Sequence, residues 1–215
     1  MKSSTAALSI ATLSFAILIP AFGQTPSQNT QNGHIRGARE AEHMVPARAS
    51  LSETLNSNDA AGFQFRATLR DTVHLDDGVE LHKGDTLLGR VANDDMNVPG
   101  RSHLAVRFTK AMLKNGQTIP IKATVVAVYS PNQLENNDGY DIPEQIPNNW
   151  NDGTLKVDQI NALHDVDLHS RIASRNSAVF VSTKDNDVKI PRGSEIALAI
   201  SGRPNGQFNS MNRGS

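Results

Sequence analysis

The sequence contains no cysteine among its 215 residues. It therefore cannot form a disulfide framework, a thiol nucleophile, a cysteine-containing zinc site or the acylated cysteine of a lipoprotein. It also lacks an excess of charge of one sign, since 21 Lys and Arg stand against 22 Asp and Glu for a net charge of −1. Without a basic run, the electrostatic signature of a nucleic-acid-binding protein is missing. We expect neither a nucleic-acid partner nor binding to a membrane surface.

Long apolar runs are scarce as well, and the one candidate lies near the start. Its apolar centre, Ala6–Ile19, follows a lysine and has the length of a secretory signal core, too short to span a membrane comfortably. Ala21 and Gly23 supply the small residues that cleavage before Gln24 requires. The pattern predicts a signal peptide over residues 1–23 and a periplasmic or secreted product without a stable membrane span. An uncleaved anchor is the alternative.

Three segments follow the predicted signal. Residues 24–50 are rich in Gln, Asn, Ser, Gly and Arg, which predicts a disordered linker because such a composition buries too little apolar surface. Residues 51–201 show apolar side chains at a period of two, which is typical of strands. Residues 202–215 are polar and predict a disordered tail. The fold class is therefore mainly β, with one small β-barrel or sandwich-like domain.

Short strands separated by tight turns fill the domain. Apolar and polar residues alternate over Phe63–Leu69, and the turn at 76–78 joins Thr72–Leu75 to Val79–His82. The dipeptide 115–116 is the strongest hairpin signal, since Asn and Gly both tolerate positive φ. Further strands are predicted at Thr86–Val91, His103–Phe108 and Ile119–Val128.

The C-terminal third is less regular. Val157–Leu168 fits a helical template as well as a strand template. Ala178–Ser182 and Val188–Ile200 are separated by the turn residues 185–187, and we expect them to pair as a hairpin that closes the domain.

Between the strands lies a long polar excursion, Ser130–Gly153, with five acidic residues and no Lys or Arg. Its exceptional residues are large and apolar or aromatic: Tyr140, Ile142, Ile146 and the single tryptophan, Trp150. Such residues are enriched in binding hot spots, and an acidic loop steers a basic partner. We predict that they form a partner-binding site; the alternative is that they fold back and cap the core.

The same excursion raises the question of calcium. Asn136, Asp138 and Gly139 imitate the middle of a calcium-binding loop. Leu134 and Gln145 stand where the first carboxylate and the closing glutamate are required. The EF-hand pattern therefore fails at both ends, and an irregular calcium site remains the alternative to a solvated loop.

An internal repeat points to a closed sheet. Residues 79–87 and 188–196 share the order apolar, polar, apolar, any, basic, Gly, polar, polar, apolar. Each copy fits a short strand, a glycine-dependent turn and a second strand, a way to take a sheet around a barrel corner. We expect positive φ or a close backbone approach at Gly84 and Gly193, and assign structural turns to Gly89 and Gly116 as well. Chance similarity of two turns is the alternative.

Three stretches together resemble the conjugation TrbI-like family: Leu81–Val91, Leu104–Phe108 and Lys114–Ile121, with Leu51–Ser57 as the approach to the first strand. Members of that family are β-barrel subunits of type IV secretion core complexes. The resemblance covers about a third of the chain, over residues 51–128. It implies a barrel and an envelope setting. It does not imply a pore, because the polar 130–153 excursion has no apolar counterpart of the family's helical insertion.

Signatures of catalysis and of metal binding are few. The sequence has no His-Glu-x-x-His zinc-protease motif and no Gly-x-Ser-x-Gly hydrolase motif. A hairpin around 76–78 would place Thr72, His74, Glu80 and His82 on one face of its two strands. We predict that this face is polar and solvated, and a metal site is the alternative. Neither a helix nor a strand brings His164 and His169 together, and the adjacent carboxylates at 94–95 are typical of a turn rather than an acid/base pair.

These observations predict a non-catalytic envelope protein that binds another envelope protein, within a type IV secretion-like assembly and with self-association as a further option. No cofactor and no metal are expected. The alternatives are a carbohydrate- or peptidoglycan-acting hydrolase, whose carboxylates would come from distant strands, and a small-ligand-binding β module.

Overall fold

A computed structural model describes residues 43–131, 156–182, 184 and 186–202 of the chain. All thirteen elements with bounds in these ranges are strands, which confirms the mainly β fold class. No helix in these ranges is long and apolar enough to cross a membrane. The strands are β1 (Val45–Leu51), β2 (Leu55–Asn56), β3 (Gln64–Leu69), β4 (Val73–His74), β5 (Glu80–Leu81), β6 (Thr86–Ala92), β7 (Ser102–Met112), β8 (Thr118–Tyr129), β9 (Lys156–Leu163), β10 (Val166–Arg171), β11 (Ala178–Ser182), β12 (Lys189–Ile190) and β13 (Glu195–Gly202).

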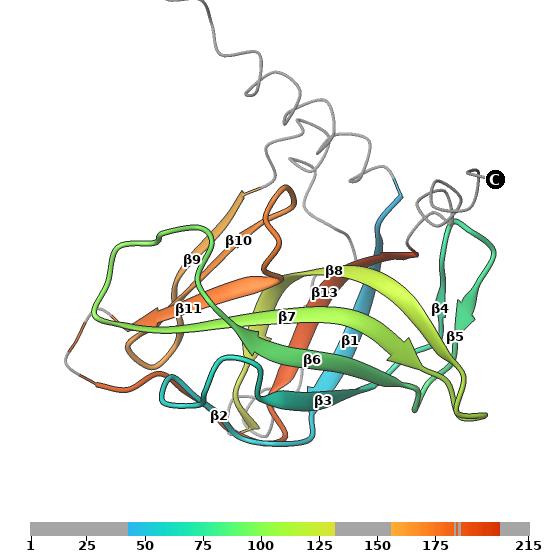
Figure 1. Ribbon diagram of the computed structural model, residues 1–215, viewed down its shortest axis with the longest axis horizontal. Helices are drawn as coiled ribbons and strands as arrows, with labels where there is room; N and C mark the ends of the chain where they lie inside the picture. The colour runs from blue at the N-terminus through green and yellow to red at the C-terminus, as the bar shows by residue number, and fades with distance from the viewer. Residues whose placement is uncertain (1–42, 132–155, 183, 185, 203–215) are drawn as a thin grey trace, which may run out of the picture.

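Six of these strands close into an antiparallel barrel. They follow the order β6-β3-β1-β13-β8-β7, and β6 also pairs with β7, which joins the two ends of the row. Closure removes the free edges that an open sheet would expose. The domain is therefore a barrel rather than a sandwich, and the front wall formed by β3, β6 and β7 is visible in Figure 1.

The remaining long strands extend the sheet beyond the barrel. The N-terminal part of β7 pairs with β11, and β10 and β9 follow in order. Ser177, just before β11, lies between β7 and β8: its amide donates to Val106 O and its carbonyl accepts from Val125 N, both at 2.8 Å. Its hydroxyl also accepts from Phe108 N at 3.0 Å. Ser177 thus connects β7 and β8 beyond their hairpin, where the two strands no longer pair with each other.

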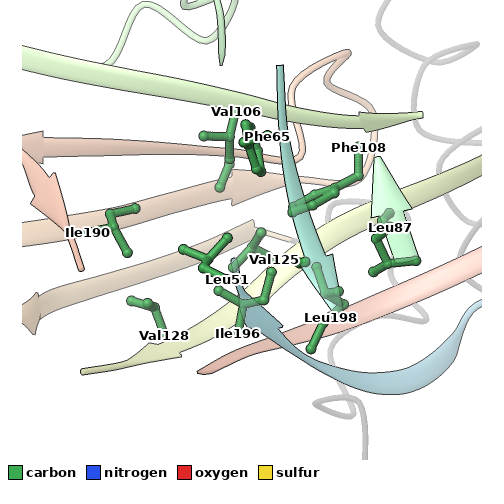
Figure 2. Packing of buried hydrophobic residues seen from close by; sticks show 14 of the residues in the cluster. Leu51, Phe65, Leu87, Val106, Phe108, Val125, Val128, Ile190, Ile196 and Leu198 are labelled. Atoms are coloured by element: carbon green, nitrogen blue, oxygen red, sulfur yellow. The ribbon is translucent and has the colours of Figure 1, made fainter. Parts of the chain in front are cut away.

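The barrel interior is filled by the alternate apolar residues of its strands. In β3, for example, Phe65, Ala67 and Leu69 are buried while Gln64 and Arg66 are exposed, as the period of two predicts. The rings of Phe65 and Phe108 meet edge to face at a centroid distance of 5.2 Å. Figure 2 shows these rings with labelled aliphatic core residues from several barrel strands and β12.

Apart from β7 and β8, the barrel consists of two similar halves, and the similarity is visible in the sequence. Residues 48–55 read Arg-Ala-Ser-Leu-Ser-Glu-Thr-Leu and residues 66–73 read Arg-Ala-Thr-Leu-Arg-Asp-Thr-Val. Each stretch forms a long strand followed by a two-residue strand, β1–β2 and β3–β4. The two-residue strands pair with β12 and β5, and the chain then turns at the glycine of the 79–87 and 188–196 repeat into β13 and β6.

We call β3 to β6 the continuous half, because residues 64–92 form it without interruption. We call β1, β2, β12 and β13 the split half, because it is assembled from residues 45–57 and 188–202. The halves meet at the pairing of β1 with β3, whose register, Ala49 with Leu69 and Leu51 with Ala67, is unchanged when the two copies are exchanged. A pseudo-twofold axis therefore passes between these two strands.

Two boundaries of the sequence interpretation are wrong. Residues 45–50, assigned to the disordered linker 24–50, form most of β1, and Met44, Ala47 and Ala49 are buried. Small alanines alternating with polar residues give a weak hydrophobic signal, but pairing with β13 and β3 covers them on both sides. At the other end, β13 continues through Gly202, one residue beyond the expected domain limit of 201.

The expected hairpin of Ala178–Ser182 with Val188–Ile200 does not form. β11 pairs with β7 and β10, whereas β13 pairs with β1 and β8. Both strands are buried on both faces, so their alternation gives no information about which neighbour each one takes. Val157–Leu168, which fitted a helix or a strand, lies within β9 and β10.

The four glycines assigned to turns have two different roles. Gly84, Gly116 and Gly193 have φ of +90, +82 and +83, in the region that favours glycine. Gly89 instead lies inside β6, which corrects its assignment as a turn. A Cβ at Gly89 would lie 2.4 Å from Cζ of Phe65, so glycine is required there by the close approach of the ring.

Candidate functional site

The outer edge of β9 is the place where the sheet ends. β9 pairs with β10 on one side, and no backbone hydrogen bond joins its other side to any described residue. An edge of this kind presents unpaired N–H and C=O groups, which form a template for another extended chain. Residues 121–129 of β8 also pair on one side only, with β13, although Ser177 contacts this edge at Val125. β9, part of which lies close to β8, is the last strand of the sheet, so its outer edge is the candidate place for strand addition.

The side chains of β9 divide the strand into two parts. At its start, Lys156 and Asp158 form an ion pair, and Asp158 also contacts His169 Nδ1 on β10 at 2.7 Å. Charges of this kind discourage nonspecific edge pairing. Ile160, in the middle, is 77% exposed. The only other large hydrophobic side chain exposed in the described part is Phe63, at 42%.

The backbone of β9 is irregular next to Ile160. Asn161 has φ of +53, and the pairing with β10 shifts register between Val166 and Leu168. The amide of Asn161 is satisfied by Asp167 Oδ1 at 2.8 Å. Beyond this point Ala162 and Leu163 turn into the core. The bulge thus ends the edge, and Ile160 remains outside as its one apolar contact point.

The partner-binding residues predicted from the sequence, Tyr140, Ile142, Ile146 and Trp150, lie outside the described residues, as do the calcium-like residues at 136–139. They precede β9 directly along the chain, since Trp150 is six positions before Lys156. Sequence reasoning missed Ile160, because β9 has no strict alternation and its exposure depends on which strand ends the sheet.

The barrel interior offers little room for a ligand. Nine side chains of the described residues line a small void, which measures about 10 Å³. This is about the lower limit for one water molecule and far below the 300–1,000 Å³ of a typical ligand pocket. The lining is apolar and consists of Leu51, Leu55, Phe65, Val106, Phe108, Val125, Phe180, Ile190 and Ile196.

The adjacent carboxylates at 94–95 are used by the loop that covers β7 and β11. Asp94 accepts from the amides of Met96, Asn97 and Val98 at 2.8 to 3.1 Å and lies 3.2 Å from His103 Nδ1. Asp95 accepts from the hydroxyl of Ser174 and the amide of Arg175. Met96 and Val98 pack on the outer apolar faces of the two strands. The carboxylates therefore organise a loop, as turn chemistry predicts.

The predicted polar face of the β4–β5 hairpin is present. Oε1 of Glu80 lies 3.5 Å from Nε2 of His74 and 3.4 Å from Nδ1 of His82, and all three side chains are solvent-exposed. His164 and His169 lie apart, next to Asp165 and Asp158. Within the described ranges no group of three such side chains has the geometry to hold a metal ion.

Among the described residues, three carboxyl groups have clearly shifted pKa values, and all three shifts are downward. Hydrogen bonds from Arg48 lower the pKa of Asp71, and a hydrogen bond from Lys184 lowers that of Asp165. Burial raises the pKa of Asp158, but hydrogen bonds from Lys156 and His169 outweigh it and leave the value lowered. A general acid needs a raised pKa, so these three groups serve as ion-pair partners.

Reciprocal ion pairs fasten the two halves together. Arg48 of the split half donates to Asp71 of the continuous half at 2.6 and 2.9 Å. Arg66 of the continuous half contacts Glu53 of the split half at 3.2 Å. Each arginine is the first residue of its eight-residue copy and each acid the sixth residue of the other copy, so the pseudo-twofold exchanges the pairs. The repeated eight residues are the sequence signal that would have revealed them.

The sequence matches no protein-family model, and no curated protein is significantly similar to it. Among solved structures, the chain is similar to ComB10 of the Com type IV secretion system of Helicobacter pylori. The sequence identity is 14%, over 73% of this chain and 83% of that chain, with a TM-score of 0.34. ComB10 belongs to the class of assembly that the TrbI-like resemblance implies, but a likeness of this size carries neither fold nor function to this chain.

Proposed function

We propose that the protein is a non-catalytic component of the cell envelope that binds another envelope protein by strand addition at β9. The observation that carries the proposal is the outer edge of β9, which has no backbone partner among the described residues and presents Ile160 to solvent. Main-chain hydrogen bonds at such an edge give affinity, and an exposed apolar side chain gives specificity.

Two further features support a binding role. The barrel core is packed with apolar side chains, and the void described above measures only about 10 Å³, so its interior serves stability. The carboxyls at 94–95, 71, 158 and 165 are held by amides or cations, so their role is structural. The signal-like residues 1–23 are the basis for the envelope setting, and the TrbI-like stretches within 51–128 are the basis for a type IV secretion-like assembly.

The test compares the two exposed apolar side chains. Partners would be captured from native envelope extract with the unmodified protein, with Ile160→Asp and with Phe63→Asp as the matched control. We expect the captured protein to be lost only with Ile160→Asp, since a charge at the edge opposes strand pairing.

Hydrogen exchange then locates the contact on the purified complex. Strand addition predicts that β9 amides become protected on binding, while those of β7, already paired on both sides over part of its length, change little. Equal capture by both variants, or protection confined to other strands, would refute the proposal.

A further inference from the structure

The charges of this nearly neutral chain are unevenly distributed over the barrel. Four neighbouring strands, β3, β6, β7 and β8, contain five Lys and Arg residues and no Asp or Glu. These cations are Arg66, Arg90, Arg107, Lys110 and Lys122. None of their side chains points into the apolar core. We call the outer surface of β3, β6 and β7 the cationic wall; its strands form the front of the barrel in Figure 1.

The strand register brings the cations of the wall together. Arg90 on β6 lies directly opposite Arg107 on β7, and Gln64 on β3 lies on its other side. In the next row, Leu88 lies between Arg66 and Lys110. Like charges directly opposite each other destabilise a sheet. The register therefore concentrates positive charge around Arg90, which favours an anion on the outside of the wall.

Two exposed positions of the wall are open to such an anion. Arg90 and Lys110 are both exposed, and no described carboxylate lies within ion-pair distance of either. Arg66 is engaged with Glu53 but remains 61% exposed. The wall thus has cations in two adjacent rows around a half-buried leucine.

We infer that the cationic wall binds an acidic segment of a partner polypeptide. Positions i and i+2 of an extended chain are about 6.6 to 6.8 Å apart, and neighbouring strands about 4.8 Å, so acidic side chains at alternate positions reach the cations of both rows. The guanidinium of Arg90 binds a carboxylate in bidentate fashion. Leu88 offers an apolar contact between the charges.

Other anionic partners fit the wall less well. Its outward residues include no Phe, Tyr or Trp side chain on which a nucleobase could stack, and the imidazole of His103 is engaged with Asp94. A small closed barrel is also convex, so few of its cations reach a flat lipid surface at the same time. The inference is independent of strand addition at β9. Strand addition depends on backbone hydrogen bonds, whereas binding at the cationic wall depends on side-chain charge.

The test uses poly-L-glutamate of about 20 residues as the probe, with binding measured by calorimetry at low and at physiological salt. Arg90→Gln/Lys110→Gln is compared with Lys189→Gln/Arg192→Gln, which removes one exposed Lys on β12 and one exposed Arg in the turn after it. We expect the wall variant to weaken binding about tenfold, which is about 1.4 kcal/mol, and the control less than twofold, since exposed ion pairs contribute only modestly.

Three outcomes would overturn the inference. These are an equal loss in both variants, no binding of poly-L-glutamate by the unmodified protein, and tighter binding to single-stranded DNA or to phosphatidylglycerol vesicles than to the peptide. Thermal melts of both variants confirm that each is folded. Ile160→Asp, which tests strand addition, should leave the affinity for poly-L-glutamate unchanged.

Discussion

The continuous and split halves of the barrel form the same type of corner with different residues. In both, the corner glycine donates its amide to the leucine that ends the neighbouring strand, Gly84 to Leu69 and Gly193 to Leu51, at 2.9 Å. In both, a threonine hydroxyl accepts the amide of the basic residue before the glycine, at 3.3 Å for Thr72 and 3.0 Å for Thr54. The backbone hydrogen bonding of the corner is thus the shared feature.

The halves differ in how their side chains fill the core. In the continuous half, Phe65 lies opposite Gly89, whereas the equivalent pair in the split half is Ala47 opposite Leu198. A large residue faces a small one in both, but on opposite strands. The two halves therefore share the pairing of one large with one small side chain, although the residue size at each individual position differs. Close packing of the core requires this.

The largest change in stability is expected from moving the large side chain from position 65 to position 89. Phe65→Ala alone should destabilise the domain by about 3–5 kcal/mol through the cavity and the lost contact with Phe108. Gly89→Leu alone should destabilise it by at least about 2 kcal/mol because the new side chain overlaps the ring of Phe65. The double variant reproduces the arrangement of the split half, and denaturant unfolding should show it to be less destabilised than the sum of the singles by more than 1 kcal/mol. Additive losses would contradict the equivalence of the two pairs.

Substitution of the residue after each corner glycine should destabilise the protein to clearly different extents in the two halves. Asp85 is buried, and its carboxylate accepts from the amides of His82 at 2.8 Å and of Lys114 at 3.0 Å. Its counterpart Ser194 is buried with no hydrogen-bond partner for its hydroxyl. Asp85→Ala should therefore cost about 2–4 kcal/mol, while Ser194→Ala should be neutral or slightly stabilising. Similar losses in urea melts would show that the carboxylate does not anchor the continuous half to the β7–β8 hairpin.

The glycines themselves should behave alike. Gly84→Val and Gly193→Val both place a β-branched residue at positive φ, and each should destabilise by about 1–3 kcal/mol. The extra contact is mild in both cases, since a Cβ would lie 3.2 Å from the flexible Cε of Lys114 or 3.6 Å from Cγ of Pro131. Thermal melts that show no loss for either variant would remove the corner assignment.

The smallest effect concerns the reciprocal ion pairs. The folded-state pKa of Asp71 is lowered, so its pair with Arg48 stabilises the protein above the unfolded pKa of about 3.9 and is lost as pH falls through the folded value. Both side chains are more than 40% exposed. Screening therefore limits the cost of Asp71→Asn at pH 7 to about 0.5 kcal/mol, and this cost should disappear in acid. A penalty that persists at pH 2 would assign it to packing instead. Glu53→Gln, melted in parallel, shows whether the second pair contributes equally.

Much of the architecture could be predicted from local sequence patterns. The alternation of Phe65, Ala67 and Leu69 located β3, and the glycine-containing repeat located both corners, because these signals depend on neighbouring residues. The start of β1 was missed because its buried residues are mostly alanines. The partner of β11 was missed because a strand buried on both faces has no alternation to reveal its neighbours.

The candidate site was the part that sequence reasoning could not place. Ile160 is exposed only because β9 happens to be the last strand of the extension, and that is a property of topology. The like-charge pair Arg90 and Arg107 is 17 positions apart in sequence, so it becomes visible only with the strand register. The predicted interface at Tyr140 and Trp150 remains a prediction.

The pairing of β1 with β13 joins residue 45 to residue 200, the first and last strands of the barrel. Contacts between such distant positions raise the contact order. A high contact order slows folding, because a long loop must close before the contacts of the pairing can stabilise the chain. A chain that emerges N-terminus first can form the continuous half early, but it cannot close the barrel until residue 202 is available. The split half is therefore the last part of the barrel to close, and it stays open until both ends of the domain are present.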